Sequence, residues 1–239
     1  MEVGQIIKEV RWCFDEEAAN NADFIGASDR DSALMDNIIK AKIGDALRWV
    51  CLYAPADVLN GSDSGTDTDI VREARLGPGV TYGGMTLNIN NEKGYGTVTL
   101  PADFVKLARI RVDNWHRAVT TPIAEDSDEY LQLNDENGAT ATYDRPQAAI
   151  IETLPKKIEA WPMKNQDGGC TVTVVCAPSV SVDTDTRDDH DVAMPPKAKA
   201  AIIYYLAFLV LSAYEDSRAA RMLEIAKMNL GLTDDRQRA

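Results

Sequence analysis

The run AAIIYYLAFLVLSAY, from Ala200 to Tyr214, is the feature that most limits how this chain can fold. It is apolar on almost every side of a helix, and such a helix must be buried by its own chain, by a second subunit or by lipid. Spanning a bilayer takes about 20 apolar residues, whereas this run is shorter and has charged residues at both ends. We therefore expect protein around it, and no membrane partner.

The apolar run is part of a longer predicted helix, Pro195 to Leu230. Proline is well tolerated in the first helical turn, and Gly231 suits the left-handed conformation that often ends a helix. From Asp216 onward the pattern becomes amphipathic, with apolar residues at three- and four-residue spacing. One end of the helix is thus expected to be central to a core, and the other end to be half exposed or docked on a partner.

Two amphipathic helices are predicted near the N-terminus. Apolar residues recur with helical spacing over residues 3–18, and again over residues 34–54 after possible N-caps at Asp29 to Ser32. Each helix carries an apolar stripe that needs a partner. Residues 1–59 and the helix at 192–230 are therefore predicted to form one bundle.

The sequence between these helices predicts an inserted β domain, which makes the fold class α+β. Residues 60–84 look like a flexible loop region with a short helical segment at 69–75, and residues 85–191 like a β meander or sandwich. Asn137-Gly138 is the best hairpin turn signal. The predicted strands are Thr86–Ile89, Thr97–Leu100, Lys106–Val112, Tyr130–Leu133, Thr140–Tyr143, Ala148–Thr153, Lys157–Trp161 and Thr171–Ala177.

The third of these predicted strands alternates. Ala108, Ile110 and Val112 are expected to face one way, while Arg109 and Arg111 face the other. Such alternation is typical of a strand with one buried side and one wet side.

Composition limits the classes of partner. The net charge of −13 disfavours broad binding to nucleic acid, which depends on neutralising phosphates. It is compatible with a surface that does not adhere to DNA, although solubility is the simpler explanation. The cysteines, which form no CxxC pair, are expected to be free and mostly buried thiols; they are Cys13, Cys51, Cys170 and Cys176.

Two acidic loops are candidate metal sites. The first combines carboxylates with a histidine, a ligand set that can bind a divalent cation; its members are Asp183, Asp185, Asp188, Asp189, His190 and Asp191. The spacing is not that of an EF-hand, and acidic loops are usually solvated. The second loop, with Asp63, Asp67 and Asp69, gives a weaker signal.

No convincing active site emerges from the motifs. The chain has two histidines, His116 and His190, and lacks the GxSxG and nucleotide-binding glycine motifs. We predict no catalytic residue, no cofactor-binding residue and no metal ligand. The aromatic residues are assigned to the core or to subunit contacts rather than to base stacking; they are Trp115, Trp161, Tyr204, Tyr205 and Tyr214.

A series of short boxes resembles the head-to-tail adaptor, or connector, proteins of tailed phages. The first is LPADFVKL at Leu100 to Leu107, which enters a predicted strand. The others follow in the same order as in the family; they are RPQA at 145–148, IEAWP at 158–162, VTVVCAP at 172–178, MP at 194–195, YYL at 204–206 and AYED at 213–216.

The resemblance implies a non-enzymatic subunit of the virion neck or tail, assembled in the host cytoplasm. Members of this family form twelve-fold rings beneath the portal, extend the DNA channel and give the tail its attachment surface. Their C-terminal end commonly docks on the portal, and here that end is the polar tail at residues 231–239. The implied partners are further copies of the chain, the portal, and tail or further ring proteins, with DNA passing through the lumen.

Two alternatives stay open at this point. The chain could be another virion protein, either a tail terminator or a minor capsid subunit. It could also be a metal-dependent hydrolase that uses the acidic cluster at residues 183–191.

Overall fold

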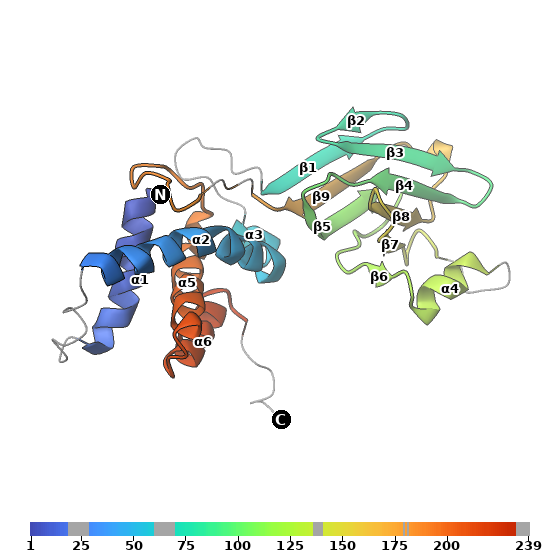
Figure 1. Ribbon diagram of the computed structural model, residues 1–239. Coiled ribbons are helices and arrows are strands. Elements are labelled where there is room, and N and C mark those ends of the chain that lie inside the picture. The colour runs from blue at the N-terminus through green and yellow to red at the C-terminus, as the bar shows by residue number, and fades with distance from the viewer. Residues whose placement is uncertain (19–28, 60–69, 136–140, 179, 181, 233–239) are drawn as a thin grey trace, which may run out of the picture. The chain divides into compact units, whose positions relative to one another are not determined.

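The computed structural model describes residues 1–18, 29–59, 70–135, 141–178, 180 and 182–232. The chain divides into two compact units (Figure 1). A helical unit is built from residues 1–70 and 177–239, and a β unit from residues 71–176. The α+β fold class with an inserted, mainly antiparallel β region is thereby confirmed.

The two N-terminal helices form as the apolar spacing predicts. Helix α1 spans Val3–Ala18 and α2 spans Asp29–Tyr53, so the predicted caps at 29–32 lie inside α2 rather than before it. A short helix, α3 (Ala56–Leu59), follows Pro55. The stripes of α1 and α2 are fully or almost fully buried; they contain Val3, Ile6, Ile7, Val10, Phe14, Ile39, Ile43, Ala46, Leu47 and Val50.

Helix α5 is the centre of the helical unit. A short 3-10 turn, η2 (Pro196–Ala198), leads into α5 (Lys199–Ala213), which contacts α1, α2 and α6 (Ala219–Asn229). Its buried residues lie on more than one side; they are Ala201, Ile202, Ile203, Leu206, Ala207, Val210 and Leu211. The prediction that this run forms the core is confirmed.

The prediction of one continuous helix from Pro195 to Leu230 is wrong. The helix stops at Ala213, and Glu215 adopts φ 55°, a left-handed conformation that ends helices. The Asp216 carboxylate then accepts a hydrogen bond from the Arg218 backbone N–H at 2.9 Å, just before α6 begins. The side chain of Arg218 also donates to the Phe14 carbonyl at 3.2 Å, which ties this turn to α1.

The hydropathy of α5 is high enough to raise the question of a membrane span. Among the described residues, one segment, Pro196–Ala213, is long and apolar enough to cross a membrane by length and composition alone. That is weak evidence, because the core helix of a soluble protein passes the same test. Since α5 packs against three other helices of its own unit, its composition is explained by this protein core.

The β unit is a sandwich of two sheets (Figure 1). In the described residues, the first sheet has the order β1-β9-β5 and the second the order β2-β3-β4-β8-β7-β6. All pairings are antiparallel except that of β6 with β7. The strands are β1 (Val71–Leu76), β2 (Thr81–Tyr82), β3 (Met85–Asn90), β4 (Tyr95–Thr99), β5 (Phe104–Val112), β6 (Ile123–Ala124), β7 (Gln147–Ile151), β8 (Lys157–Trp161) and β9 (Cys170–Cys176).

Side chains from both sheets fill the space between them. Leu76, Leu87, Ile110, Ile158 and Val172 are among the members of this core that have no exposed surface. A second, smaller cluster lies on the opposite side of β7 and β8 and is covered by helix α4 (Asp128–Asn134). It contains Ala149, Ile151 and Trp161, with Tyr130 and Leu133 of α4 packed against them.

A buried carboxylate closes one end of the sandwich. Asp167 lies in the short 3-10 turn η1 (Asn165–Asp167) and is only 3% exposed. It accepts hydrogen bonds from Asn114 Nδ2 at 3.0 Å, from the Tyr143 hydroxyl at 3.1 Å and from the Lys164 backbone N–H at 2.7 Å. Burial, and then the contact with Asp167, raises the pKa of Tyr143.

The boundaries of the β region differ from those predicted. Residues 71–76 form β1 rather than a helical segment in a loop, because they pair with β9 from Val71↔Val175 to Leu76↔Cys170. The loop at 177–191 belongs to the helical unit, so the β unit ends at Cys176 and not at 191.

One predicted strand, Tyr130–Leu133, is part of the helix α4 instead. Ser127 is the N-cap and accepts a hydrogen bond from the Tyr130 backbone N–H at 3.2 Å, while Asp128 and Glu129 favour the first turn. Residues 141–143 are not a strand either. Most of residues 60–69, the Asn137-Gly138 turn and the tail at 233–239 lie outside the described residues.

Candidate assembly surfaces

An aromatic surface joins α2 to α5. Trp49 of α2 stacks on Tyr205 of α5 with ring centroids 4.0 Å apart and planes 7° apart. Tyr53 packs against Trp49, and Phe208 against Tyr205, each at 5.4 Å. We call these four residues the aromatic face.

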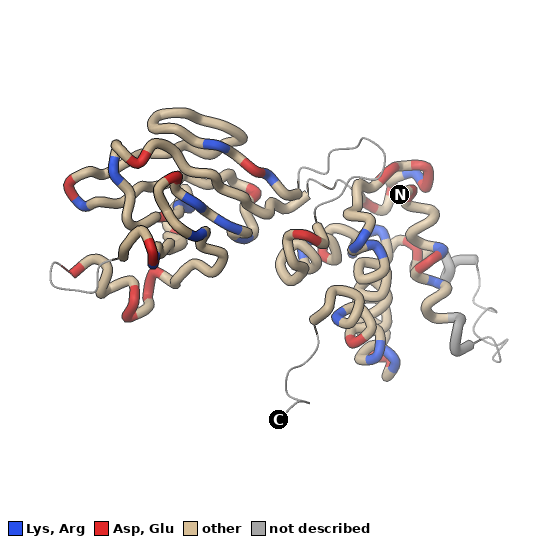
Figure 2. Tube along the Cα trace, turned by 180° about the vertical axis from the view of Figure 1, so that it is seen from behind, with Lys and Arg blue, Asp and Glu red and all other residues tan. Residues whose placement is uncertain are grey.

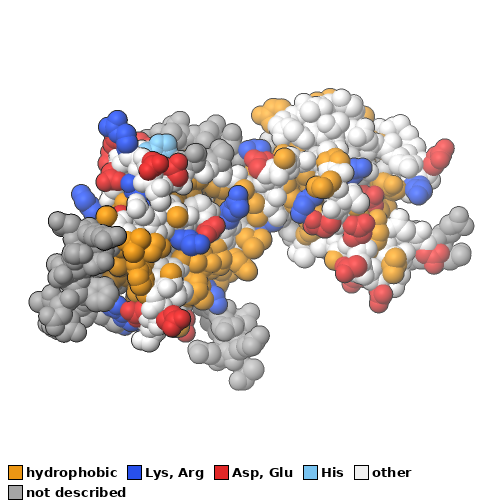
Figure 3. Space-filling model, in the orientation of Figure 1, with side chains coloured by type: hydrophobic (Ala, Val, Ile, Leu, Met, Phe, Trp, Pro, Cys, Tyr) orange, Lys and Arg blue, Asp and Glu red, His pale blue; other side chains and the backbone are white. Residues whose placement is uncertain are grey.

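The aromatic face is only partly covered by its own chain. Tyr53 is 51% exposed, and its neighbour Leu52 is 49% exposed. Burial, and then the nearby Tyr53 and Asp45, raises the pKa of Tyr205 above its usual value. Figure 3 shows hydrophobic side chains at the surface of the helical unit. Contiguous apolar surface of this kind marks contacts with other proteins.

The outer side of the β1-β9-β5 sheet is basic. Arg109 and Arg111 of β5 and Arg75 of β1 point outward, while their strand neighbours Ile110 and Leu76 are buried. The tube in Figure 2 shows blue positions along these strands. We call Arg75, Arg109 and Arg111 the basic face.

Two of these arginines have local carboxylate partners. Arg75 forms a two-pronged ion pair with Asp113, with both N···O distances 2.7 Å, and Arg109 donates to Glu73 at 3.0 Å. Arg111 has no ion pair with any residue that the structure describes. The expected wet side of this strand is confirmed for both arginines. A register shift between Leu107 and Arg109 turns Leu107 toward the core and leaves Ala108 half-buried.

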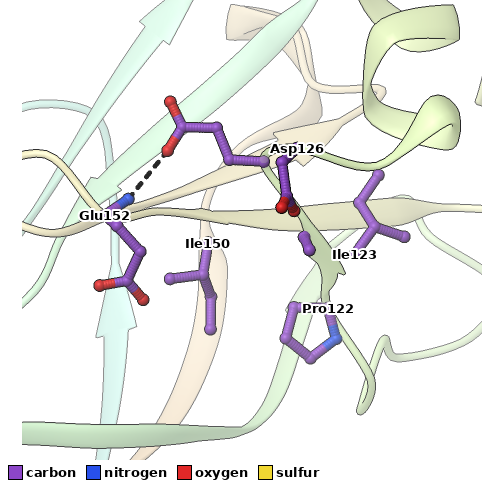
Figure 4. A pocket seen from close by; sticks show the side chains of 7 residues that line it. Pro122, Ile123, Asp126, Ile150 and Glu152 are labelled. Carbon is purple, nitrogen blue, oxygen red and sulfur yellow. Dashed lines mark hydrogen bonds between the residues drawn. The ribbon is translucent and has the colours of Figure 1, made fainter.

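An acidic hollow lies at the β6–β7 edge of the six-stranded sheet (Figure 4). It has a volume of about 540 Å³. Its lining combines apolar side chains with three carboxylates; the residues are Pro122, Ile123, Ala124, Glu125, Asp126, Ile150 and Glu152.

The two segments that form the hollow are joined by the pairing of β6 with β7 and by a contact between a backbone N–H and a side chain. The Glu152 N–H donates to Glu125 Oε2 at 3.1 Å, as the dashed line in Figure 4 shows, and thereby joins the two segments that form the hollow. Lys156 pairs with the Glu152 carboxylate at 2.6 Å. Asp126 is exposed and has no ion pair within the described part of the chain.

The structure gives the loop at residues 183–191 another role than metal binding. The carbonyls of Asp188 and His190 accept hydrogen bonds from Gly4 and Val3, each at 2.9 Å, and so satisfy the first N–H groups of α1. Lys40 of α2 pairs with Asp188 at 3.0 Å. In the described residues, no three His, Cys, Asp or Glu side chains gather in a group that could hold a metal ion.

Two further carboxylates of this loop have partners within the loop, and Asp191 pairs with the N-terminal amine of Met1 at 3.5 Å. The Thr186 hydroxyl donates to Asp183 at 2.8 Å, which lowers the pKa of that carboxyl, and Arg187 pairs with Asp189 at 2.9 Å. Among the described residues, the loop therefore does not bring its candidate ligands together; they are Asp183, Asp185, Asp188, Asp189, His190 and Asp191. The second predicted loop, with Asp63, Asp67 and Asp69, lies outside the described residues.

The histidines and aromatics fall in several places. His116 is exposed and contacts Asp144, and His190 is also exposed. Trp115 and Trp161 are buried in the β unit, which confirms the core assignment for those two. All four cysteines are free thiols, and only Cys13 is not fully buried.

Sequence reasoning did not identify Trp49 and Tyr53 as part of a surface. They lie four residues apart on α2, off the buried stripe of that helix. Their four-residue spacing indicates that they share one side of α2. It does not indicate the stack with Tyr205, because that depends on how α2 packs against α5.

The comparisons identify the family. A family model described as SU10 adaptor protein matches residues 3–239. The comparison with curated proteins found no match. The match covers nearly the whole chain, both the helical unit and the β unit. The chain therefore belongs to the SU10 adaptor protein family, and it is a structural adaptor protein of a phage virion.

Proposed function

We propose that this chain is the repeating subunit of a head-to-tail connector ring. The ring docks below the portal, extends the DNA channel and provides the surface to which the tail attaches. Membership of the adaptor family supports a structural role in contact with other virion proteins. The observation that carries the ring assignment is the aromatic face, which its own chain leaves partly exposed.

The aromatic face has the composition of a protein contact. Tyrosine, tryptophan and phenylalanine are enriched at interfaces, and burying apolar area contributes about 25 cal/mol per Å². Trp49 and Tyr205 already hold each other in place, so little side-chain freedom is lost when a neighbour covers them. We propose that the aromatic face packs against the next copy in a twelve-fold ring.

The charge of the chain supports passage of DNA through the ring. The net charge is −13, and most of the excess of acidic over basic residues belongs to residues 1–70 and 177–239. A negative wall repels phosphates and so disfavours adhesion of the DNA that must slide past. This predicts no sequence-specific DNA binding.

The C-terminal segment supplies the proposed portal contact. Helix α6 ends at Asn229, and Gly231 has φ 72° and closes the helix by donating its N–H to Met228 at 3.0 Å. The polar residues that follow, up to Ala239, are free of the helical pattern. We propose that they bind the portal.

One substitution pair tests the ring assignment. Leu52→Arg places a charge beside Tyr53, whereas Val80→Arg, at the same exposed fraction of 49%, alters the β unit instead. Negative-stain imaging with purified portal should show rings for wild type and Val80→Arg, and few or none for Leu52→Arg. Equal ring formation by both variants, with both folded by circular dichroism, would remove the aromatic face from the interface.

A further inference from the structure

We propose that neighbouring copies also bind through their β units, with the basic face of one copy seated on the acidic hollow of the next. This inference rests on the proposed ring function, because it assigns a second contact between subunits of that ring. It concerns two surfaces of one β unit that differ in both charge and position in the fold.

The basic face is unusual in so acidic a chain. Three guanidinium groups lie on one side of one sheet, and the side chains of Arg75 and Arg109 are 65% and 52% exposed although each has a carboxylate partner. Arg111 is exposed and has no ion pair with any described residue. Arg111 can therefore pair with a carboxylate of a partner without first breaking an ion pair to a described residue, and the exposed guanidinium groups of Arg75 and Arg109 lie beside it.

The acidic hollow has the complementary chemistry. Glu125, Asp126 and Glu152 surround a floor made of Pro122, Ile123 and Ile150. Among the described residues, one ion pair involves these three carboxylates, that between Glu152 and Lys156. The surface thus combines an anionic rim, which attracts cations, with apolar area, which a long arginine side chain can cover with its methylene groups.

An exposed leucine extends the apolar part of this edge. Leu154 is 92% exposed and lies two residues from Glu152, in the connection between β7 and β8. A single exposed leucine is ordinary on a protein surface, whereas apolar area gathered in one patch marks a contact. Together with the hollow it gives the edge both charge and apolar area.

The geometry favours a second copy as the occupant. The basic face belongs to the outer side of the β1-β9-β5 sheet, whereas the hollow lies at the β6–β7 edge of the other sheet. A contact between two different surfaces of identical subunits is heterologous, and it generates a ring when the rotation closes. Two different and complementary surfaces on one unit are what a heterologous contact needs.

DNA fits the basic face less well. The carboxylates of Glu73 and Asp113 lie among the arginines of this surface and pair with them. They would repel the uniformly anionic backbone of DNA, whereas the rim of the hollow also carries the cation of Lys156, which can face one of them. The face is thus better matched to the rim of the hollow than to nucleic acid.

Two charge-reversed variants test the pairing. The face variant carries Arg109→Glu and Arg111→Glu, which makes its formerly basic face acidic, like its hollow. The hollow variant carries Asp126→Lys and Glu152→Lys, which makes its formerly acidic hollow basic, like its face. Matched controls reverse the same charges at exposed positions elsewhere in the β unit: Lys93→Glu with Lys164→Glu, and Glu92→Lys with Asp144→Lys.

Sedimentation velocity at low salt measures self-association over a range of concentrations. We expect wild type and both controls to self-associate. Their association should weaken as the salt concentration rises, because salt screens the attraction between the charged surfaces. Each reversed variant alone should associate at least about tenfold more weakly. An equimolar mixture of the two variants should recover association, since the acidic copy and the basic copy can alternate.

Several results overturn the inference. They are undiminished association of either variant alone, a mixture that stays dissociated, or a wild-type protein that remains monomeric at low salt. Loss of duplex DNA binding by the face variant, with its self-association intact, would reassign the basic face to DNA. Ring formation on the portal, imaged for the same proteins, separates the two proposals: normal rings from both variants refute this contact alone, whereas absence of rings from wild type refutes the proposed function.

Discussion

The indole of Trp49 lies flat against the phenol ring of Tyr205, with centroids 4.0 Å apart, and this stack connects α2 to α5. The pair has two roles in our account. It stabilises the helical unit from the outside, and it holds the aromatic face in a fixed arrangement for a neighbour. The two roles can be separated by measurement, because stability is a property of the single chain and ring formation is not.

Trp49→Ala should lower the free energy of unfolding by about 2 kcal/mol, since a half-buried indole loses both its packing area and its stacked partner. Urea denaturation followed by circular dichroism measures this change. Tyr82→Ala, at a residue that is 60% exposed in the β unit, is the control and should change stability by less than about 0.5 kcal/mol. Equal effects of both substitutions would show that the stack contributes little.

The buried carboxylate of the β unit gives a second prediction. Asp167→Ala leaves Asn114, Tyr143 and the Lys164 N–H without their acceptor. We expect a loss of about 3 kcal/mol in the stability of the β unit, because buried donors without acceptors are costly. Asp144→Ala removes a carboxylate whose side chain is 76% exposed and should leave stability nearly unchanged. An unchanged urea midpoint for Asp167→Ala would contradict the role of this network.

These contacts show which parts of the fold the sequence could predict. The bounds of β8, Lys157–Trp161, and the burial of α5 follow from local spacing alone. Strand β1 does not, because residues 71–76 become a strand only by pairing with β9, which lies far along the chain. The break after Ala213 was missed because the pattern of apolar residues continues through it, while Glu215 and Asp216 end the helix.

The candidate surfaces, too, are predictable where the signal is local and unpredictable where segments far apart in the sequence meet. Alternation in β5 predicted that Arg109 and Arg111 face water. The acidic hollow was not predictable, because it combines residues 122–126 with residues 150 and 152 across a sheet edge. The acidic loop is a candidate metal site in the sequence, where no metal ligand is predicted, and in the structure Asp188 pairs with Lys40 of α2, a contact that no local pattern indicates.

The turn between α5 and α6 makes a prediction about pH. Arg218, whose side chain and backbone N–H both bind the carboxylate, lowers the pKa of Asp216. A carboxyl with a lowered pKa adds stability above its unfolded pKa of about 3.9, and this is lost as the pH falls through its folded value. Asp216→Asn should therefore cost about 1 kcal/mol at pH 7 and less as the pH falls below 4. Urea midpoints at both pH values measure it, and a pH-independent difference would contradict the assignment.

Core burial of α5 is tested by a charge. Leu206 has no exposed surface, and Leu206→Asp would bury a carboxylate without a partner, at a cost of several kcal/mol. We expect insoluble or unassembled protein. Ala200→Asp, at an exposed position in the first turn of the same helix, should remain soluble because a negative charge is favourable there. Soluble Leu206→Asp protein that forms rings would show that the core lies elsewhere.

The C-terminal segment can be removed without disturbing the helix end. Gly231 and Leu232 donate backbone hydrogen bonds that close α6, so a chain that ends at Leu232 keeps this closure. Loss of residues 233–239 should leave rings intact and weaken their binding to the portal. Surface plasmon resonance with immobilised portal measures the difference, and unchanged affinity would refute the portal role of this segment.

The central claim is that this chain assembles as a ring on the portal, and imaging the purified protein with purified portal tests it most directly. Class averages from negative-stain microscopy should show a twelve-fold ring added beneath the portal, with an open channel along its axis. A chain that stays monomeric and never binds the portal, at every salt and protein concentration tried, would contradict the account.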